Sequence, residues 1–256
     1  MTDWSKHRVL IVNDDGIHAP GIQLLEKIVR RYTDNVWVVA PDEEKSGASH
    51  SISMHVPVRI RQIDERHYAV KGTPTDCALL AIYEIMKERP TMLLSGINRG
   101  ANLAEDITYS GTAAAAMEGA LLGVPSVALS QVFTPRGHVP WETAEAYAPR
   151  ILDTLFATEW QPGTFVNVNF PDALPDAVAG IRVVRQGQRP PGSFLPEGRI
   201  DGRDVPYYWI KLAYRDGGFE PGSDLEAIRD NAISVNPIQL DMTAERFRAR
   251  LESAFG

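Results

Sequence analysis

Short apolar runs and helical patterns alternate along the first part of the chain. Residues 9–12 and 36–40 are continuous apolar runs, a pattern typical of strands that are covered on both faces. Between them, apolar side chains recur at helical spacing through residues 21–32. This strand–helix–strand order predicts a βαβ unit with a right-handed crossover, and therefore a parallel sheet.

The alternation continues as far as residue 170. Apolar residues at every second position of 52–60 predict a half-exposed strand, with residues 67–70 as its partner in a hairpin. The other predicted elements are helices at 74–88, 111–122 and 141–156, and strands at 91–95, 126–130 and 164–170. The whole pattern predicts an α/β fold with a mostly parallel sheet.

The pattern changes after about residue 185. Residues 186–206 are rich in Gly, Pro and Arg and show little periodicity, whereas residues 207–212 are strand-like and unusually aromatic. We expect this part to leave the core as an extension. An exposed aromatic strand often marks a partner surface, and packing of the strand on its own domain is an equally good interpretation.

A strand pattern returns at 232–236, and a helical pattern at 244–255 closes the chain. We therefore expect the chain to have three parts. They are a core (1–185), an extension (186–231), and a returning strand with a C-terminal helix (232–256).

Composition narrows the possible classes of function. The chain has 256 residues, of which 44% are hydrophobic and 23% charged, values that suit one large folded domain. With 26 Lys and Arg against 33 Asp and Glu, the formal net charge is −7. This excess of negative charge disfavours binding to duplex nucleic acid, which needs many phosphate contacts, but it permits a local anion site.

Cysteine content and hydropathy exclude further classes. Cys77 is the single cysteine and lies in an apolar helical run, so we expect a buried side chain and neither a disulfide nor a cysteine-based zinc site. No apolar stretch is long enough to span a bilayer, and residues 1–8 contain no apolar signal core. We therefore expect a cytoplasmic protein with no membrane association.

Polar residues follow three of the predicted strands. Asp14 and Asp15 come directly after the first strand, Ser46 lies in the loop after the second, and Asn98 follows the strand at 91–95. Because parallel strands present their carboxyl ends at one edge of the sheet, we expect these four side chains to converge. Two adjacent carboxylates repel each other unless they share a cation or a proton. Oxygen ligands without thiolates suit Mg²⁺ or Mn²⁺.

Each of these residues also has a plain structural interpretation. Asp and Asn favour caps and turns, and the loop around Ser46, taken alone, is an ordinary polar loop. The predicted metal site therefore depends on the three loops meeting at one edge.

The start of the helix at 111–122 offers a place for an anion. Free backbone amides and the helix dipole favour phosphate there, and the hydroxyl groups of Ser110 and Thr112 add donors. A plain Ser/Thr N-cap is the commoner use of such residues. A metal beside a phosphate site indicates hydrolysis of phosphate esters. The sequence contains no P-loop, dinucleotide-binding fingerprint or nucleophile elbow.

Several of these motifs resemble those of one known family. Residues 9–22, VLIVNDDGIHAPGI, closely resemble the opening of the SurE-type survival-protein nucleotidases. The segments at 39–49, 95–102, 109–112 and 233–243 resemble further motifs of the same family. The resemblance extends from about residue 8 to residue 245, with the segment at 185–225 the least alike.

This resemblance implies a metal-dependent phosphatase that acts on nucleoside 5′- and 3′-monophosphates, with some members also trimming short polyphosphate. The family's ligands for one divalent ion, Mg²⁺ or Mn²⁺, match Asp14, Asp15, Ser46 and Asn98. Its phosphate-binding surroundings match Asn102, Ser110, Gly111 and Thr112. The implied fold is a three-layer Rossmann-like core with a projecting β-hairpin and a C-terminal extension. Both exchange between subunits, giving homodimers or homotetramers.

The expected chemistry is centred on the two aspartates. We expect a metal to bridge Asp14, Asp15 and a phosphate oxygen while water attacks in line, with Asp15 as general base or acid. Direct attack by an Asp carboxylate stays open. So do two other functions, a nucleotide sensor without hydrolysis and an oligomeric scaffold. A phosphatase of the haloacid-dehalogenase type ranks low, because it usually carries D-x-D rather than adjacent aspartates.

Overall fold

The computed structural model of the chain describes residues 4–134, 138–192, 194–212 and 219–256. Its central strands are β1 (Val9–Val12), β2 (Val36–Pro41), β4 (His67–Lys71), β5 (Met92–Arg99), β6 (Ser126–Gln131) and β7 (Thr164–Phe170). Neighbours among these strands pair in parallel. The expected α/β fold with a mostly parallel sheet is confirmed.

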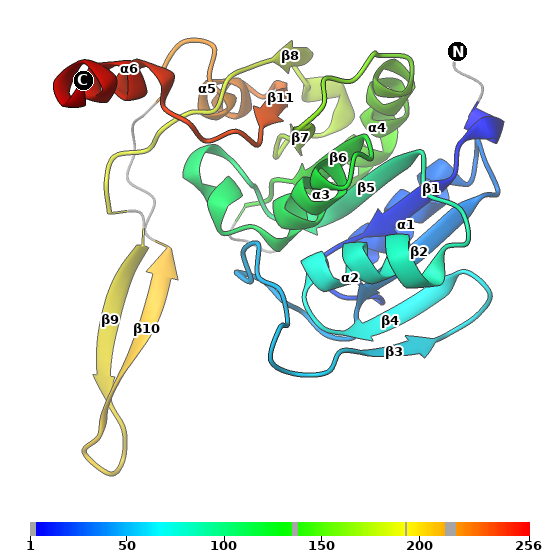
Figure 1. Cartoon of the computed structure of the whole chain (residues 1–256), viewed down its shortest axis with the longest axis horizontal. Helices are drawn as coiled ribbons and strands as arrows, with labels where there is room; N and C mark the ends of the chain where they lie inside the picture. Colours follow the sequence, from blue (N-terminus) through cyan, green and yellow to red (C-terminus); the bar gives the residue numbers. More distant parts are fainter. Residues whose placement is uncertain (1–3, 135–137, 193, 213–218) are drawn as a thin grey trace.

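Three strands at the edges complete the sheet. β3 (Arg59–Gln62) pairs antiparallel with β4, β11 (Ile233–Gln239) pairs antiparallel with β7, and β8 (Ile181–Val183) pairs in parallel with β11. Within the described residues the sheet has nine strands, in the order β3-β4-β2-β1-β5-β6-β7-β11-β8 (Figure 1).

Helices cover both faces of the sheet. α1 (Pro20–Val29) and α4 (Trp141–Phe156) pack together on one face, and α2 (Pro74–Leu80) and α3 (Gly111–Leu121) pack together on the other (Figure 1). All four residues of β1 are apolar because both faces of this strand are buried. Val9 and Ile11 belong to the core under α1, while Leu10 and Val12 belong to the core under α2.

Local sequence explains where the two helices near the predicted site begin. Thr73 and Asp76 form a capping box at the start of α2, in which each side chain accepts a hydrogen bond from the other residue's backbone amide. Ser110 caps α3, and its Oγ accepts a hydrogen bond from the amide of Ala113 at 3.0 Å. The helix predicted at 111–122 is therefore present with the expected start.

The strand expected at 52–60 is wrong for most of its length, because β3 begins only at Arg59. Ile52, Met54 and Val56 are each at least half exposed, so these side chains do not face the core, whereas Val58 packs against it. The segment instead forms a loop over the start of α2, where the amide of Ser53 donates to Asp76 Oδ1 at 3.0 Å. Pro57 has no amide proton for a strand ladder. The expected hairpin pairing with residues 67–70 is confirmed.

The helix predicted at 74–88 is shorter and changes type. α2 ends at Leu80, and Ala81–Ile85 continue as a π-helical turn. The amide of Met86 bonds to the carbonyl of Ala81, which closes this turn. Cys77 is fully buried, as expected. The short helical turns elsewhere are Trp4–Lys6, Ala104–Thr108 and Pro175–Ala177.

The chain leaves the core as a hairpin. β9 (Phe194–Ile200) and β10 (Pro206–Leu212) pair with each other in a separate antiparallel sheet that projects away from the body (Figure 1, yellow). Tyr208, Trp209 and Ile210 are each more than half exposed, so this aromatic strand does not pack on its own domain.

After the hairpin the chain returns through α5 (Asp224–Arg229), which the sequence analysis missed, and then through β11. α6 (Glu245–Phe255) follows at the C-terminus and lies beyond the body of the molecule, with no buried residue (Figure 1, red). No described helix combines the length and the apolar character that a membrane span requires. The cytoplasmic location stays a prediction.

Candidate active site

The predicted site lies where the order of the strands reverses. β1 pairs with β2 on one side and with β5 on the other. The crossover through α1 leads to β2, and the later crossover through α2 leads back across β1 to β5. A crevice opens at such a reversal, outside the carboxyl ends of the strands, and it is the usual ligand site of open α/β sheets. Asp14 and Asp15 follow β1 there, and Asn98 lies near the end of β5.

A tight turn presents the two aspartates. The side chain of Asn13, fully buried, donates to the carbonyl of Gly16 at 2.8 Å and accepts from the Gly16 amide at 3.2 Å. Gly16 has a φ of 99°, a left-handed conformation that side chains disfavour. The turn therefore needs Asn and Gly at its two ends, and it holds Asp14 and Asp15 between them.

Asp14 is buried against the start of α3. It is 4% exposed, and its Oδ1 accepts a hydrogen bond from Thr112 Oγ1 at 2.5 Å. A Cβ on Gly111 would lie only 2.8 Å from the Asp14 Cβ, so this approach requires glycine. Burial raises the pKa of Asp14, while the Thr112 hydrogen bond opposes that rise.

Asp15 is more accessible and faces a cavity. Its Oδ2 accepts a hydrogen bond from the backbone amide of Arg99 at 3.0 Å, which ties the end of β1 to the end of β5. Burial, followed by repulsion from Asp14, raises the pKa of Asp15 to about 6. The pair thus combines two features that favour cation binding: carboxylate groups and partial burial.

The loop after β2 lies beside this pair. The amide of Lys45 donates to the Asp14 carbonyl at 2.7 Å. Ser46, the next residue, donates its hydroxyl proton to Glu44 Oε1 at 2.8 Å and leaves its oxygen lone pairs available. Ser46 and Asp15 both line a cavity of about 270 Å³. The structure therefore brings the second loop to the first, as the sequence predicts.

The two predicted asparagines differ in their surroundings. The Asn98 Nδ2 donates to the carbonyl of Gly100 at 3.1 Å, which leaves Oδ1 as the atom available to a cation. The Asn102 Nδ2 donates to Ser130 Oγ at 2.8 Å, deep in the sheet, and Asn102 is only 7% exposed. Its backbone is held as well, since its amide donates to Asn169 Oδ1 at 2.8 Å. Asn102 thus belongs to a buried amide network, and its phosphate-binding role stays a prediction.

The first turn of α3 supplies amides for an anion. Ser110 and Thr112 are both nearly or fully buried, and each hydroxyl is already engaged, with Ala113 and Asp14 respectively. The amides of Gly111 and Thr112 have no carbonyl one turn earlier within the helix. Thr112 therefore positions Asp14, and the backbone amides are the groups that suit phosphate.

Comparison with known proteins identifies the family of this chain. A family model described as "Survival protein SurE" matches residues 9–192, well over half of the chain. The chain belongs to the SurE family. A relative from Brucella suis, named 5'-nucleotidase SurE, is 48% identical over 252 residues and covers 97% of this chain and 98% of its own. One of the same name from a Methylobacterium species is 50% identical and covers 97% and 100%.

A solved SurE structure has the same fold. The crystal structure of the SurE protein from Aquifex aeolicus matches with a TM-score of 0.83 at 37% identity, and it covers 97% of this chain and 99% of that protein. The resemblance to the SurE family drawn from the sequence is confirmed. All eight predicted site residues lie inside the matched range of 9–192.

Sequence reasoning missed two polar residues of this candidate site. Glu44 contacts Ser46, and its negative charge adds a little to the rise in the pKa of Asp14 and Asp15 that burial chiefly causes. Arg99 contributes its backbone amide to Asp15. The only signal for Glu44 was its place in the acidic run before Ser46, and Arg99 followed a predicted ligand directly.

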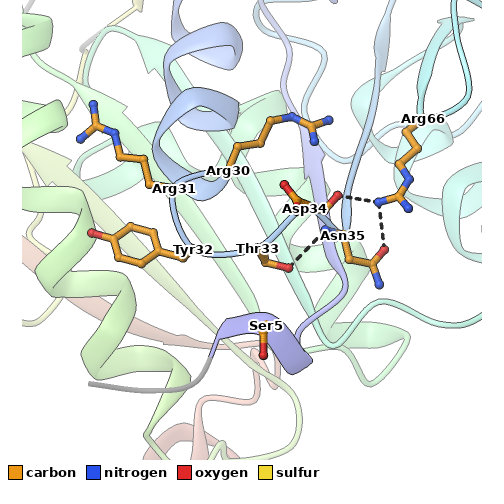
Figure 2. A pocket seen from close by; sticks show the side chains of 8 residues that line it. All are labelled: Ser5, Arg30, Arg31, Tyr32, Thr33, Asp34, Asn35 and Arg66. Carbon is orange, nitrogen blue, oxygen red and sulfur yellow. Dashed lines mark hydrogen bonds between the residues drawn. The ribbon is translucent and has the colours of Figure 1, made fainter.

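Another cavity, of about 440 Å³, lies at the opposite edge of the sheet (Figure 2). It is lined by the end of α1 and the loop that leads into β2. Figure 2 shows Arg30, Arg31 and Arg66 pointing in different directions. Each is engaged within the protein: Arg30 with Glu26, Arg31 with a glutamate of α4, and Arg66 with the Asp34 carbonyl. The arginines therefore do not form a common anion site.

Proposed function

We propose that this chain hydrolyses nucleoside 5′-monophosphates to nucleoside and phosphate. The observation that carries the proposal is the contact of Asp14 with the first turn of α3, where Gly111 lets the carboxylate approach the helix start. A carboxylate pair and free helix amides then lie side by side, as a phosphate ester bound through a cation requires. Near full-length relatives named 5'-nucleotidase SurE support the choice of substrate. The proposal includes nucleoside 3′-monophosphates and short polyphosphate.

The residues present fit one divalent cation. Asp14 and Asp15 are carboxylates whose burial and mutual repulsion call for a compensating positive charge. Ser46 and Asn98 add a hydroxyl and an amide oxygen, and such hard donors suit Mg²⁺ or Mn²⁺. Within the described residues, no three His, Cys, Asp or Glu side chains group to hold a metal. The proposed set needs only two carboxylates. A bound cation would neutralise charge on the transferring phosphoryl group.

Other residues of the chain bind and orient the phosphate group. The amides of Gly111 and Thr112 receive the phosphate oxygens at the start of α3, with Ser110 as the cap and Asn102 behind the loop. Thr112 fixes the Asp14 carboxylate through its hydrogen bond. These roles orient the phosphorus for in-line attack.

Asp15 is the residue that we assign to proton transfer. Arg99 holds its Oδ2, so Oδ1 is the atom that takes a proton from the attacking water. The pKa of about 6, raised chiefly by burial, belongs to Asp15 in the cation-free protein, and a bound cation would lower it again. Asp14 is more deeply buried and its Oδ1 is bonded to Thr112, which suits it to a fixed position.

The test is phosphate release by Asp14→Asn and Asp15→Asn, with nucleotide binding measured in parallel. We expect both variants to lose most turnover and to stay folded, with loss on the order of 100-fold or more. Asp176→Asn, an exposed aspartate elsewhere, is the matched control and should keep wild-type turnover. Near-wild-type turnover by both variants would contradict the site. Nucleotide binding without any release by the wild type would favour a sensor, and phosphate trapped on the protein would favour direct attack by an aspartate.

The proposal also includes self-assembly through the extension at 186–231. The β9–β10 hairpin is supported by its own pairing alone, and its aromatic residues are exposed. α6 has no buried residue in one chain. Apolar surface of this kind favours a homodimer or homotetramer, in which a second copy covers it.

A further inference from the structure

The start of the extension contacts the candidate site of its own chain. Residues 186–189, which we call the root, follow β8 and precede the β9–β10 hairpin. They bond to residues 103–106, at the beginning of the helical turn Ala104–Thr108 that precedes α3. Two of these residues, Arg189 and Asp106, are charged and buried, and the proposed reaction gives neither of them a role.

Arg189 is the centre of this contact. It is 9% exposed, and two nitrogens of its guanidinium group donate to Asp106, at 3.0 Å to Oδ1 and at 2.9 Å to Oδ2. The same group donates to the Leu103 carbonyl at 3.1 Å. Asp106 is 7% exposed, so both charges of the pair are largely removed from water. A planar guanidinium group suits such a two-nitrogen contact, whereas a lysine ammonium group does not.

Two further contacts fix the backbone of Ala104. Gln186 Nε2 donates to its carbonyl at 2.9 Å, and its amide donates to Asp224 Oδ2 at 2.9 Å. Asp224, fully buried at the start of α5, also accepts a hydrogen bond from the Gly187 amide at 2.9 Å. Ala104 has a φ of 51°, a left-handed conformation that persists in a residue with a side chain only where the surroundings hold it. The root therefore helps to impose the conformation of residues 103–106.

Asp106 connects this segment to the start of α3. Its backbone carbonyl accepts hydrogen bonds from the amides of Tyr109 at 2.9 Å and Ser110 at 3.0 Å. Ser110 caps α3, and the amides that we propose for phosphate belong to the next two residues, Gly111 and Thr112. A shift of Asp106 would therefore move the cap and change the direction of these amides.

We propose that Arg189 is a positioning residue for phosphate binding, which acts through Asp106 on the start of α3. The inference rests on the phosphate site proposed above and deepens it. It gives the extension a role within its own subunit, in addition to the proposed role in self-assembly. The candidate active site then depends on a buried contact between the core and the root, in addition to the loops of the core.

The first test separates binding from turnover in Arg189→Lys. The lysine keeps a positive charge beside the buried carboxylate, so we expect a folded protein that lacks the two-nitrogen contact. KM for a nucleoside 5′-monophosphate and the inhibition constant of inorganic phosphate should rise together by roughly tenfold, with a smaller fall in kcat. A merely structural role would lower the folded fraction, and with it the apparent kcat, at wild-type KM and inhibition constant. That result would overturn the proposal.

Arg185→Lys is the matched control, because Arg185 directly precedes the root but its side chain is 59% exposed and pairs with the exposed Glu220. It should keep both wild-type constants. Asp106→Asn is a second variant and should raise the same two constants as Arg189→Lys. The double variant, Asp106→Asn with Arg189→Lys, should be little worse than either single one. Fully additive effects would overturn the proposed action through Asp106.

Hydrogen exchange in excess chelator tests the positioning without hydrolysis. We expect the amides of residues 103–113 to exchange about tenfold faster in Arg189→Lys than in the wild type, with unchanged exchange in α4. Unchanged exchange at 103–113 would overturn the proposal.

The affinity for inorganic phosphate, measured by equilibrium dialysis with Mn²⁺, separates this inference from the proposed function. If the wild type releases no phosphate from any nucleotide but binds inorganic phosphate more tightly than Arg189→Lys does, the proposed hydrolysis fails and the positioning role stands. Equal affinity in the two proteins would overturn the positioning role, whether or not the wild type hydrolyses nucleotides.

Discussion

Asp14 and Asp15 are adjacent in sequence, but the fold removes them from water to different degrees. Asp14 is 4% exposed and bonded to Thr112, whereas Asp15 lines the cavity. The pKa of each carboxyl group is raised, chiefly by burial. Two such groups destabilise the fold when both are charged, and a bound cation reverses that effect.

We expect Asp15→Asn to stabilise the cation-free protein at neutral pH. Burial and the charge of Asp14 raise the pKa of Asp15 from 3.8 to about 6. The folded state therefore favours protonated Asp15, a contribution to stability that is complete below about pH 3.8 and is lost as the pH rises through about 6. This difference between the two pKa values corresponds to at most about 3 kcal/mol of stability. Screening by solvent reduces that figure.

This prediction is checked by urea unfolding in chelator between pH 4 and pH 8. The stability of Asp15→Asn should exceed that of the wild type at pH 7 and approach it at pH 4. Asp176→Asn, which is exposed, should follow the wild type throughout. A wild-type pH profile in Asp15→Asn would contradict the electrostatic account of the pair.

Sequence alone identified the aspartates but not the contacts that define their roles. Asp14 and Asp15 after an apolar run and Gly111 at a helix start were sufficient to predict their location. The bond from Thr112 to Asp14 joins residues 98 positions apart, and no local pattern encodes it. Glu44 and Arg99 were missed for the same reason, because their contacts with the site depend on how the loops fold over the sheet.

The loop that carries Ser46 is the least regular element of the site, and side-chain contacts anchor its far end. His50 Nε2 lies 2.9 Å from Glu118 Oε2, and Glu118 sits in the middle of α3 with 8% of its side chain exposed. Ser49 adds two bonds, its amide to the Tyr109 carbonyl and its hydroxyl to the Thr108 carbonyl. The loop is thus fastened to α3, the helix whose first-turn amides we propose as the phosphate site.

Removing this anchor should loosen the loop. We expect Glu118→Ala to cost roughly 1–3 kcal/mol of stability, because His50 loses its buried partner, and to weaken cation binding through Ser46. His50→Ala should have a similar effect, and the double variant should be little worse than either single one. Thermal unfolding and calorimetric titration with Mn²⁺ measure both quantities. Unchanged cation affinity in Glu118→Ala would show that the loop does not depend on this contact.

Elements with strong periodicity were predicted closely, and those set by loop contacts were not. The patterns at 141–156 and 164–170 correspond to α4 and β7 residue for residue. At 52–60 apolar residues do alternate with polar ones, but most of the segment pairs with no strand and lies on the surface as a loop. α5 has six residues and too short a pattern to detect.

The whole molecule combines a packed core with two segments that have little contact with it. The β9–β10 hairpin and α6 both lie outside the body of the chain (Figure 1). Phe255 is 88% exposed and Tyr208 67%, values that are unusually high for aromatic side chains of a folded protein. This surface is what a second copy of the chain would cover.

We expect Trp209→Lys to reduce or abolish self-association, because it puts a charge into the apolar surface of the hairpin. Trp209 is 57% exposed in one chain, so the substitution does not disturb the monomer's core. Leu174→Lys, at a similarly exposed position on the core, is the control and should leave the mass unchanged. Light scattering coupled to size-exclusion chromatography gives the mass. A wild-type mass for Trp209→Lys would contradict a role of the hairpin in assembly.

The central claim is that the carboxyl ends of β1 and β5 form a cation-dependent phosphomonoesterase site. It is tested most directly by phosphate release from a panel of nucleoside monophosphates with Mn²⁺, with Mg²⁺ and with excess chelator. The account predicts release with at least one of the two ions, none with chelator, and full recovery when the ion is restored. Release that survives chelation would contradict it and would place the chemistry on other residues.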